Sequence, residues 1–526
     1  MIGVLELDTD VLVAGGGPAG TWAALRAADA GADVVLVDKG WCGASGATAA
    51  SGTSVWYVEP DAEARETAMA SREGLGGYLS DRGWMARVLD ETYAGVNELA
   101  DRGRYPFPRD DEGREIRRGV QGPEYMRRMR TLVRRAGVRI LDHSPLTGLL
   151  TTSDGVVAGA AGTRRQEGVD YRVRAGAVVL ATGGCAFGSG ALGCDVDTGD
   201  GALAAAEVGA HLSGMEFSNA YAIAPAHSTV TKTAYYSYAS FYRADGTVLE
   251  GAGSTRGRSV IARTLLDEPV LCRLDHAGPA EQVAMRRGQP NFFLPFDRAG
   301  IDPFRDLFEI TLVAEGTVRG TGGIALAGTD CATGVPGLYA AGDAASREDI
   351  CGGFTGGGSH NAAWALSSGS WAGRAAAAHA HAHGRPFPTT GAGPVPSGRT
   401  PARDVVAAVQ AEVLPYDINL IRHGDRLRPA LERLDGVWDT VRAGLDGGSW
   451  RVREATAMTA VARWMYTAAL AREESRGMHK REDRPGTDPA WQRRIAVGGL
   501  DDVWFRTPSS VELPYRRAPL DAASPA

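Results

Sequence analysis

The sequence has no long apolar run, no block of like charge and few cysteines. No apolar stretch reaches the roughly 20 residues of a membrane-spanning helix, and the N-terminus has no charged region followed by a cleavable apolar segment, so we expect a cytoplasmic protein without a transmembrane segment. The net charge of −7 is spread along the 526 residues, which argues against a nucleic-acid or membrane-surface partner. The cysteines form no C-x-x-C pair, so we expect reduced thiols and neither a metal site nor an iron–sulfur cluster; they are Cys42, Cys185, Cys194, Cys272, Cys331 and Cys351.

Glycine is abundant, and a glycine motif near the N-terminus is the most informative feature. A predicted strand over 10–14, a helix over 19–30 and a strand over 34–38 surround G-x-G-x-x-G. The first glycine allows a tight turn, the second lets the backbone approach a pyrophosphate, and the third lets the helix pack on the strand. The acid ending the second strand is placed to bind an adenosine ribose and would repel a 2′-phosphate, so the motif predicts FAD or an NAD-like nucleotide and not NADP. The alternative is an ordinary βαβ turn without a ligand. The candidate cofactor residues here are Gly15, Gly17, Pro18, Ala19, Gly20, Asp38 and Lys39.

Later glycine-rich segments extend this site. The loop over 43–52 has only short side chains and is interpreted as a wall around a cofactor ring or its phosphates; its candidate residues are Ser45, Gly46, Thr48 and Gly52. A buried strand over 177–184 ends in a glycine turn with the candidates Thr182 and Gly183, and a glycine-started helix follows. Glycine-rich character returns over 321–324, 337–343 and 352–359, so the nucleotide-binding domain is predicted to be split by an insertion.

The length exceeds what one core supports, so two or three domains are expected. The predicted fold class is α/β: a Rossmann-like nucleotide-binding domain over 1–217 and 320–384, split by an inserted α+β capping domain over 218–319. A Pro/Gly-rich linker over 385–403 leads to a helical C-terminal domain and tail over 404–526.

Smaller elements are predicted within these domains. Strands over 146–152, 156–162 and 171–174 are expected to form a small antiparallel sheet. The C-terminal helices are expected over 405–420, 426–442 and 451–472. The three histidines at 379, 381 and 383 should fan around a helix axis, which argues against a metal site.

Several ordered motifs resemble the flavoprotein subunits of the succinate dehydrogenase/fumarate reductase family, which also includes aspartate oxidase and the adenylylsulfate reductase α subunit. They are GGGPAG with VLVDKG, SGATAASG, ATGG, DTGDGALAAAEVGAHLSGMEF, RSVIAR, TGGI, VPGLYAAGDAA, SSGSWAGRAAA and AREESRGMHKREDRPGTDPAWQRR. The resemblance implies bound FAD, with Asp200 and Asp343 in contact with it beside Gly342, and with Ser359 near the isoalloxazine. Family members with covalent FAD carry a histidine in the loop corresponding to 43–52; none is present here, so non-covalent FAD is expected.

The same resemblance implies a catalytic arginine but not the usual substrate site. Dicarboxylate-handling members use two histidines, an anchoring arginine and a proton-transferring arginine that begins an R-D-x-V-A-R stretch, whose position here is Arg258. The first histidine position falls at 219–223, the second at Val318, and the anchoring arginine near Phe354–Thr355. A succinate, fumarate or aspartate reaction in the usual geometry is therefore not expected. The alternative role of Arg258 is a structural salt bridge.

Other side chains are candidates for replacing the lost ones. The cap supplies aromatic and cationic residues suited to a planar or anionic substrate, although a cap core would have the same composition. They are Tyr221, His227, Lys232, Tyr235, Tyr236 and Arg319. His227 is the candidate general base and His360 a second one, and packed neutral histidines are the alternative for both. The C-terminal stretch from Glu474 to His479 is interpreted as structural.

These features predict a FAD-dependent oxidoreductase that exchanges hydride at flavin N5 with a small or medium polar metabolite. The chain has no second dinucleotide motif, so oxygen, a quinone or a redox protein is expected as the external electron acceptor. One alternative is a flavin-dependent oxidase or monooxygenase of specialised metabolism. Another is a flavin-carrying subunit of an adenylylsulfate reductase-like complex with an external iron–sulfur partner.

Overall fold

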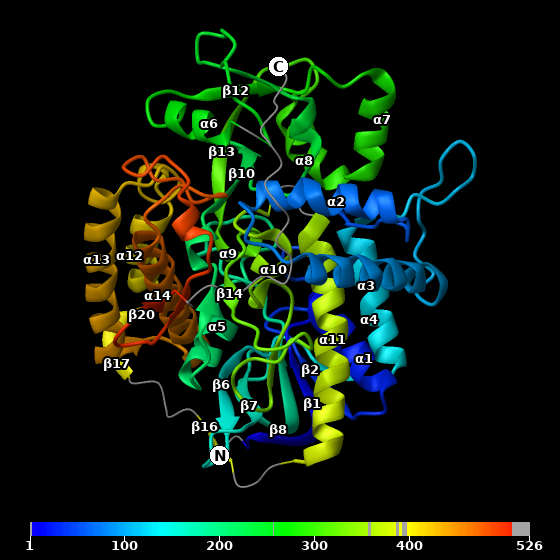
Figure 1. The fold of residues 1–526 in the computed structure, drawn as a ribbon, viewed down its shortest axis with the longest axis vertical. Coiled ribbons are helices and arrows are strands. Elements are labelled where there is room, and N and C mark those ends of the chain that lie inside the picture. Colours follow the sequence, from blue (N-terminus) through cyan, green and yellow to red (C-terminus); the bar gives the residue numbers. More distant parts are fainter. Residues whose placement is uncertain (1–2, 256, 356–358, 386–388, 392–396, 508–526) are drawn as a thin grey trace.

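The computed structural model describes residues 3–255, 257–355, 359–385, 389–391 and 397–507. Its largest sheet has eight strands in the order β16-β6-β7-β8-β1-β2-β5, with β15 also paired to β8. They are β1 (Leu5–Ala14), β2 (Val34–Val37), β5 (Arg139–Leu141), β6 (Leu146–Thr151), β7 (Val157–Arg164), β8 (Val169–Leu180), β15 (Leu338–Ala340) and β16 (Thr390–Gly391). Strands β1, β2, β5, β8 and β15 pair in parallel, so their carboxyl ends meet at one edge, which faces the middle of the molecule (Figure 1).

The predicted N-terminal βαβ unit is present. Helix α1 (Pro18–Asp29) connects β1 to β2, and Val11 pairs with Val34 in a parallel register. Strand β2 and the last four residues of β1 are buried throughout, as expected of central parallel strands. Helix α11 (Ser359–His383) crosses α1 at glycines, because a Cβ on Gly369 or Gly373 would lie 2.3 or 2.2 Å from a carbonyl oxygen of α1.

The strands predicted over 146–152, 156–162 and 171–174 are present and pair in antiparallel fashion, but they do not form a sheet of their own. Strands β6 and β7 extend the main sheet in antiparallel fashion, and β8 runs as one strand through both segments predicted as strands. Its first half alternates buried and partly exposed residues and pairs with β7, whereas its second half is buried throughout. At Ala175 and Gly176 the strand changes from burial on one face to burial on both faces. The chain makes no turn there, so the two predicted segments form one continuous strand.

Three more helices pack outside α1 and α11. They are α2 (Ala62–Leu75), α3 (Arg82–Asp101) and α4 (Gly122–Arg135), and the β3 (Gly52–Ser54) and β4 (Gly119–Gln121) pair lies next to them. Asp61 and Asp81 cap α2 and α3 by accepting a hydrogen bond from the backbone N–H of the third residue of each helix. The segment 61–102 therefore forms two helices, separated by the turn after Leu75.

The inserted segment forms an α+β cap, drawn at the top of Figure 1. Its antiparallel sheet has the order β10-β13-β12-β11, formed by β10 (Ala220–Pro225), β11 (Ser240–Tyr242), β12 (Val270–Arg273) and β13 (Phe308–Glu315). Helices α6 (Arg258–Thr264), α7 (Pro279–Gly288) and α8 (Pro290–Ala299) accompany it. Phe292, Phe293, Phe296 and Phe308 form the centre of its own apolar core.

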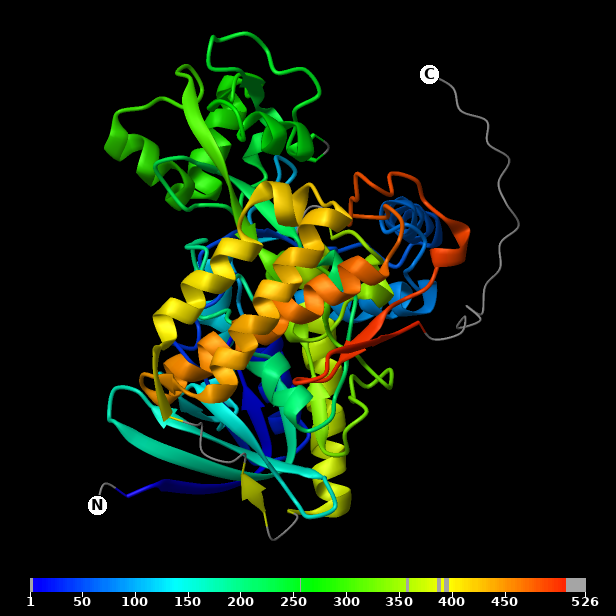
Figure 2. The same cartoon turned by 90° about the vertical axis from the view of Figure 1, so that its left-hand side faces the viewer.

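The C-terminal region is mainly helical, and Figure 2 shows its helices crossing in front of the main sheet. It contains α12 (Ala402–Val413), a π-helix (Tyr416–Leu420), α13 (Gly424–Ala443) and α14 (Ser449–Ala471). A small antiparallel sheet joins it to the nucleotide-binding part, in the order β14 (Gly323–Ile324), β9 (Leu212–Ser213), β19 (Ala496–Gly498) and β20 (Trp504–Arg506).

The predicted linker contains two short strands. Strand β16 pairs with β6, and β17 (Ser397–Pro401) pairs with β18 (Leu445–Asp446). Residues 386–388 and 392–396 of this linker, and 508–526 of the expected tail, lie outside the described residues. In the part of the chain that the structure describes, no helix has the length and apolar character required to cross a membrane.

Candidate functional site

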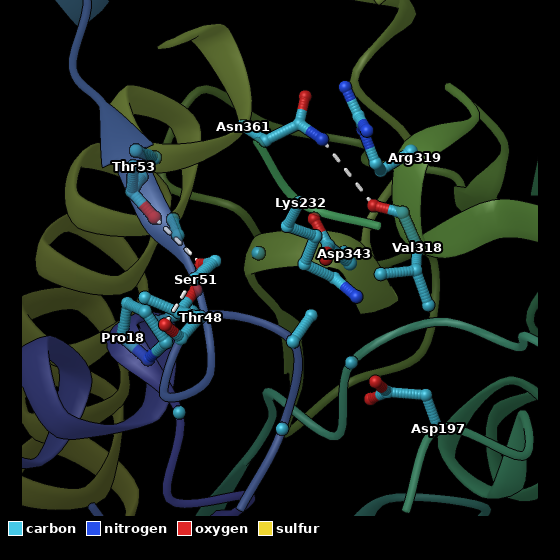
Figure 3. Close-up of a pocket in the computed structure, with 18 of the residues that line it drawn as sticks. Pro18, Thr48, Ser51, Thr53, Asp197, Lys232, Val318, Arg319, Asp343 and Asn361 are labelled. Atoms are coloured by element: carbon cyan, nitrogen blue, oxygen red, sulfur yellow. Dashed lines mark hydrogen bonds between the residues drawn. The ribbon is translucent and has the colours of Figure 1, made fainter. Parts of the chain in front are cut away.

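A cavity of about 480 Å³ lies between the carboxyl ends of the parallel strands, the cap and the start of α11. Its walls come from the glycine motif, the small-residue loop, the turn after β8, the cap and the last turn of α2. Of the predicted cofactor residues, Gly15, Gly17, Pro18, Ala19, Asp38, Lys39, Ser45, Gly46, Thr48, Gly52, Thr182, Gly183, Asp200, Gly342 and Asp343 line it. Figure 3 shows Thr48 and Ser51 near Pro18, with Lys232 and Asp343 between them and Val318.

The glycine motif has the geometry expected of a pyrophosphate site. Gly15 has a φ of +111°, and a Cβ there would lie 2.1 Å from the Ala181 carbonyl oxygen. A Cβ on Gly20 would lie 1.8 Å from the Gly15 carbonyl oxygen, so Gly20 is required for close packing of the helix on the glycine turn. It does not line the cavity. A Cβ on Gly17 would meet no described atom within 4 Å. The first turn of α1 has neither an acidic residue nor a side-chain cap, so its N–H groups are available to an anion.

Asp38 fixes the loop that follows β2. Its Oδ1 accepts hydrogen bonds from the Gly40 N–H at 2.7 Å and the Ser45 hydroxyl at 2.9 Å, and its Oδ2 accepts one from the Gly16 N–H at 2.5 Å. Burial raises its pKa against these hydrogen bonds. Because Oδ2 has one bond within the protein, it retains acceptor capacity for a ribose hydroxyl.

Lys39 connects the cavity to the C-terminal helices. Its Nζ lies 2.7 Å from Asp200 and 2.5 Å from Glu454 of α14, and donates to the Thr198 hydroxyl at 2.5 Å. Burial opposes the charged form of Lys39, but the two carboxylates outweigh it and raise its pKa. The predicted cofactor residues Lys39 and Asp200 are thus paired with each other beside the cavity.

The glycine turn after β15 places Asp343 at the cavity. The guanidinium of Arg347, which is fully buried, pairs with Asp343 and donates to the Val318 carbonyl at 2.9 Å. Burial raises the pKa of Asp343, and Arg347 opposes this. Ser359 begins α11 and its carbonyl accepts a hydrogen bond from the Trp56 N–H at 3.2 Å, but it does not line the cavity.

Asp197 is a lining residue that the motif analysis did not select, although it directly precedes TGDG. Burial, followed by the charge of Asp343, raises its pKa to about 8. Its Oδ2 is buried without a hydrogen-bond partner among the described residues, as are Thr182 Oγ1 and Asn361 Oδ1, which also border the cavity. These orphaned polar atoms and the glycine motif fit a bound dinucleotide with hydrogen-bonding groups along its length.

The cap contributes three cations to the lining, namely Lys232, Arg258 and Arg319. Glu315, fully buried at the end of β13, lies 3.0 Å from Lys232 Nζ and 3.2 Å from Arg319 Nη1. Arg258 Nη1 donates to the Tyr221 carbonyl at 3.1 Å, and its Nε has no hydrogen-bond partner among the described residues. Burial and the nearby Arg319 lower the pKa of Arg258 to about 10.

The structure does not bring Tyr221 or His227 to the cavity. The Tyr221 hydroxyl donates to the Val413 carbonyl at 2.9 Å, because α12 covers that face of β10. His227 is exposed after β10 and its ring packs against Phe296 at 5.5 Å. Tyr235 donates to the Met285 carbonyl and Tyr236 is buried in the cap core, also outside the lining. These four were interpreted as pocket residues from composition; packing accounts for the three tyrosines, whereas His227 is exposed.

His360 is likewise packed and not part of the lining. It is 2% exposed and its ring lies 4.6 Å from that of Trp56. Burial, together with nearby arginine charges, lowers its pKa to about 3, which keeps it neutral at physiological pH. His360 is therefore a buried neutral histidine, the alternative to the general base.

Helix α2 supplies a part of the wall that the sequence did not indicate. Arg72 and Leu75, in its last turn, line the cavity together with Phe354. The Arg72 side chain has no hydrogen-bond or salt-bridge partner within the described ranges, and burial lowers its pKa. Arg72 belongs to no sequence motif, and the sequence of α2 is that of an ordinary surface helix.

The C-terminal signature forms a buried ion-pair network. Arg472 lies 2.8 Å from Glu216 and 2.9 Å from Glu474, and Arg476 lies 2.6 Å from Glu474. Arg476 also donates to the Gly77 carbonyl at 2.6 Å. The signature thus joins the C-terminal helices to the turn after α2, in agreement with its structural interpretation.

The histidines near the end of α11 do not all fan apart. The rings of His379 and His383 stack at 4.3 Å, because positions four apart share a helix face, so that part of the prediction is wrong. The described residues contain no group of three or more His, Cys, Asp or Glu side chains placed to hold a metal ion.

Comparison with known proteins gives matches at both ends of the chain. A family model described as FAD binding domain matches residues 10–226, and one described as Fumarate reductase flavoprotein C-term matches 411–507. L-aspartate oxidase of Streptomyces coelicolor is 28% identical over 93% of this chain and 91% of its own length. L-aspartate oxidase of Caulobacter vibrioides is 30% identical over 69% of this chain and 68% of its own length.

Solved structures share the fold. A variant of the E. coli quinol fumarate reductase FrdA superposes with a TM-score of 0.81 at 20% identity, over 98% of this chain and 99% of that one. Adenylylsulfate reductase from Archaeoglobus fulgidus superposes with a TM-score of 0.76 at 16% identity, over 98% of each chain. At these identities the likeness describes the arrangement of the chain alone.

Proposed function

The chain belongs to the fumarate reductase/aspartate oxidase family of FAD-dependent oxidoreductases, and from this premise we propose that it exchanges hydride with a small or medium polar, anionic metabolite. FAD, when bound, supplies hydride exchange at flavin N5. The remaining chemistry falls to residues of the chain, which must bind the metabolite, orient it, exclude water and stabilise the charge that develops. We propose non-covalent FAD, because residues 43–52 contain no histidine.

The residues that would hold FAD follow from the cavity. The N–H groups at the start of α1 and the open position at Gly17 fit a pyrophosphate, and Asp38 fits an adenosine ribose. Asp343 and Asn361 lie at the end of the cavity near the cap cations (Figure 3). The metabolite would then occupy the part of the cavity nearest the cap.

Arg258 is the observation that carries the proposal. It faces the cavity with one unpartnered guanidinium nitrogen, at the position where the family resemblance expects a proton-transferring arginine. A fixed guanidinium in a largely buried site stabilises negative charge on a substrate more strongly than water does, because it needs no reorientation. A pKa of about 10 leaves it protonated at neutral pH while making proton release easier than for an exposed arginine.

The substrate is proposed to differ from succinate or fumarate bound in the usual geometry. Val318 and the stretch from Asn219 replace the two histidine positions, and Phe354 with Thr355 replaces the anchoring arginine. Val318 and Phe354 present apolar surface to the cavity. A ligand that relied on three polar partners at these positions would leave its carboxylate oxygens unsatisfied.

Arg258 and Arg263, both on α6, provide a matched test. Arg263 pairs with Glu482 at 2.7 Å and does not line the cavity. Candidate amino acids, enoates and sulfur oxyanions are mixed anaerobically with the purified holoprotein, and loss of oxidised-flavin absorbance is followed in time. We expect Arg258→Gln to slow flavin reduction about 10²–10³-fold, with flavin content unchanged, and Arg263→Gln to match the native protein. Equal reduction rates in the two variants would refute the role of Arg258.

The electron acceptor divides the remaining alternatives. The relatives named L-aspartate oxidase favour oxygen, which would make the chain an oxidase, whereas a quinone or redox protein would make it a dehydrogenase or a subunit of a larger complex. Mixing the reduced protein with air-saturated buffer and measuring hydrogen peroxide separates them. Stoichiometric peroxide within the turnover time supports the oxidase, and its absence supports an external carrier.

A further inference from the structure

The end of helix α2 places an arginine at the cavity without giving it a counter-charge. Arg72 is half-buried, and its Nε is shielded from solvent without a hydrogen-bond partner in the described ranges. No described carboxylate forms a salt bridge with it. Desolvating part of a guanidinium without a partner costs free energy, so such a residue in a ligand cavity requires a functional reason.

Arg72 is held in place by the turn that follows it. The Gly76 N–H donates to the Arg72 carbonyl at 2.9 Å, and the Gly353 N–H donates to the Gly76 carbonyl at 2.8 Å. A Cβ on Gly76 would lie 2.3 Å from the Cys351 carbonyl oxygen, so the two backbones touch. Arg476 clamps the next carbonyl, that of Gly77. The last turn of α2 is therefore fixed against the loop that carries Phe354 into the same cavity.

Two of the cations that line the cavity have no carboxylate partner among the described residues. Lys232 and Arg319 share the carboxylate of Glu315, and Asp343 is paired with Arg347. Arg72 and Arg258 have no carboxylate of their own among the described residues. The loop at Phe354, where the family resemblance expects an anchoring arginine, offers no cation there, and Arg72 reaches the cavity from the helix packed on that loop.

We propose that Arg72 anchors an oxyanion group of the substrate, replacing the arginine that is missing at Phe354–Thr355. This inference rests on the proposed function and adds the class of substrate: a small molecule with a carboxylate or another oxyanion, held by Arg72 and acted on near Arg258. The planar guanidinium suits this role because it can donate two parallel hydrogen bonds to a carboxylate or a tetrahedral oxyanion.

The test compares Arg72 with Arg65 of the same helix. Arg65 pairs with Asp90 and lies outside the lining, so Arg65→Gln removes a charge from α2 without touching the cavity. The flavin absorbance of the holoprotein is titrated with malonate, sulfate and phosphate at constant ionic strength. We expect saturable binding to the native protein and to Arg65→Gln, and at least about tenfold weaker binding to Arg72→Gln. Tighter malonate binding indicates a carboxylate substrate, and tighter sulfate or phosphate binding a tetrahedral oxyanion.

Arg72→Lys keeps the charge and serves as a second variant. We expect its affinity for the anions to lie between those of the native protein and Arg72→Gln, because a lysine keeps the charge but cannot make the paired hydrogen bonds. Equal affinities in Arg72→Gln and Arg65→Gln, or a native flavin spectrum that none of the three anions changes, would overturn the anchor. Flavin content separates this failure from the broader one: a yellow protein with such results refutes only the anchor, whereas a chain that takes up no FAD refutes the proposed function.

Discussion

Replacing Glu315 by glutamine tests whether the cationic wall of the cavity depends on one buried carboxylate. Glu315 is fully buried and accepts a hydrogen bond from the Thr231 hydroxyl at 2.6 Å, besides its ion pairs with Lys232 and Arg319. Glutamine has nearly the same shape and retains an acceptor for Thr231, but it removes the charge. Two cations then remain close together in a largely buried region that also contains Arg258.

The magnitude follows from the ionisation of Glu315. Burial opposes its charged form, but Lys232 and Arg319 overcome this and lower its pKa to about 2 from 4.5. This difference corresponds to about 3 kcal/mol of stabilisation at neutral pH, and measured losses on removing one partner of a buried ion pair are about 3–5 kcal/mol. Urea slopes of about 1–3 kcal/mol per M convert this into a midpoint lower by about 1–3 M.

The assay is urea unfolding followed by tryptophan fluorescence, with Glu309→Gln as the control. Glu309 is on the same strand but exposed, so its replacement should change the free energy of unfolding by less than about 0.5 kcal/mol. Because the carboxyl pKa is lowered in the folded state, the contribution of Glu315 is complete above pH 4.5 and disappears as the pH falls towards 2. The difference in urea midpoint between the native protein and Glu315→Gln should become smaller as the pH falls over that range. The same midpoint for Glu315→Gln and Glu309→Gln at pH 7 would refute the reasoning.

Two further substitutions test the cofactor end of the cavity. Gly17→Ala should leave the apoprotein's thermal midpoint unchanged, because the added Cβ meets no described atom and the φ of −74° suits alanine. It should nevertheless lower flavin content at least tenfold, because the Cβ blocks the approach of the backbone to a pyrophosphate. Full flavin content in Gly17→Ala, measured beside the control Gly3→Ala, would contradict the pyrophosphate site. Asp197→Asn should raise the thermal midpoint at pH 8 and not at pH 4, because a carboxyl whose pKa is raised from 3.8 to about 8 destabilises the fold as the pH rises through that window; a pH-independent difference, measured beside exposed Asp195→Asn, would show that Asp197 ionises normally.

The part of the cavity wall formed by the glycine motifs was predictable because its signals are local. The strand, glycine turn, helix and strand from Leu5 to Val37 occupy consecutive positions, and the steric demands on Gly15 and Gly20 arise from backbone within the same unit or from the neighbouring strand end. The turn after β8 and Gly342 lie at the carboxyl ends of parallel strands, where such sheets bind ligands. Pattern and position therefore lead to the same edge of the sheet.

The substrate side was less predictable because long-range packing decides which side chains reach it. Tyrosine is a residue type common in ligand pockets, but the hydroxyl of Tyr221 points to α12, almost 200 residues away in sequence. Arg72 has no motif, and it reaches the cavity only because Gly76 touches the loop at Cys351 and Gly352. Glu315 was overlooked for the same reason, since its two partners come from a loop of the cap and from the next helical turn.

The C-terminal helices fix the cavity without lining it. None of its described lining residues lies beyond Ala365, yet Glu454 holds Lys39 at one end and Arg476 holds the carbonyl of Gly77 behind Arg72 at the other. Loss of Glu454 would leave Lys39 with Asp200 alone, and loss of Arg476 would free the turn that positions Arg72. Losing either contact weakens the fixation of a residue or turn beside the cavity, so both ends of the cavity depend on this region. The C-terminal signature is thus a structural element whose effect is exerted on the geometry of binding.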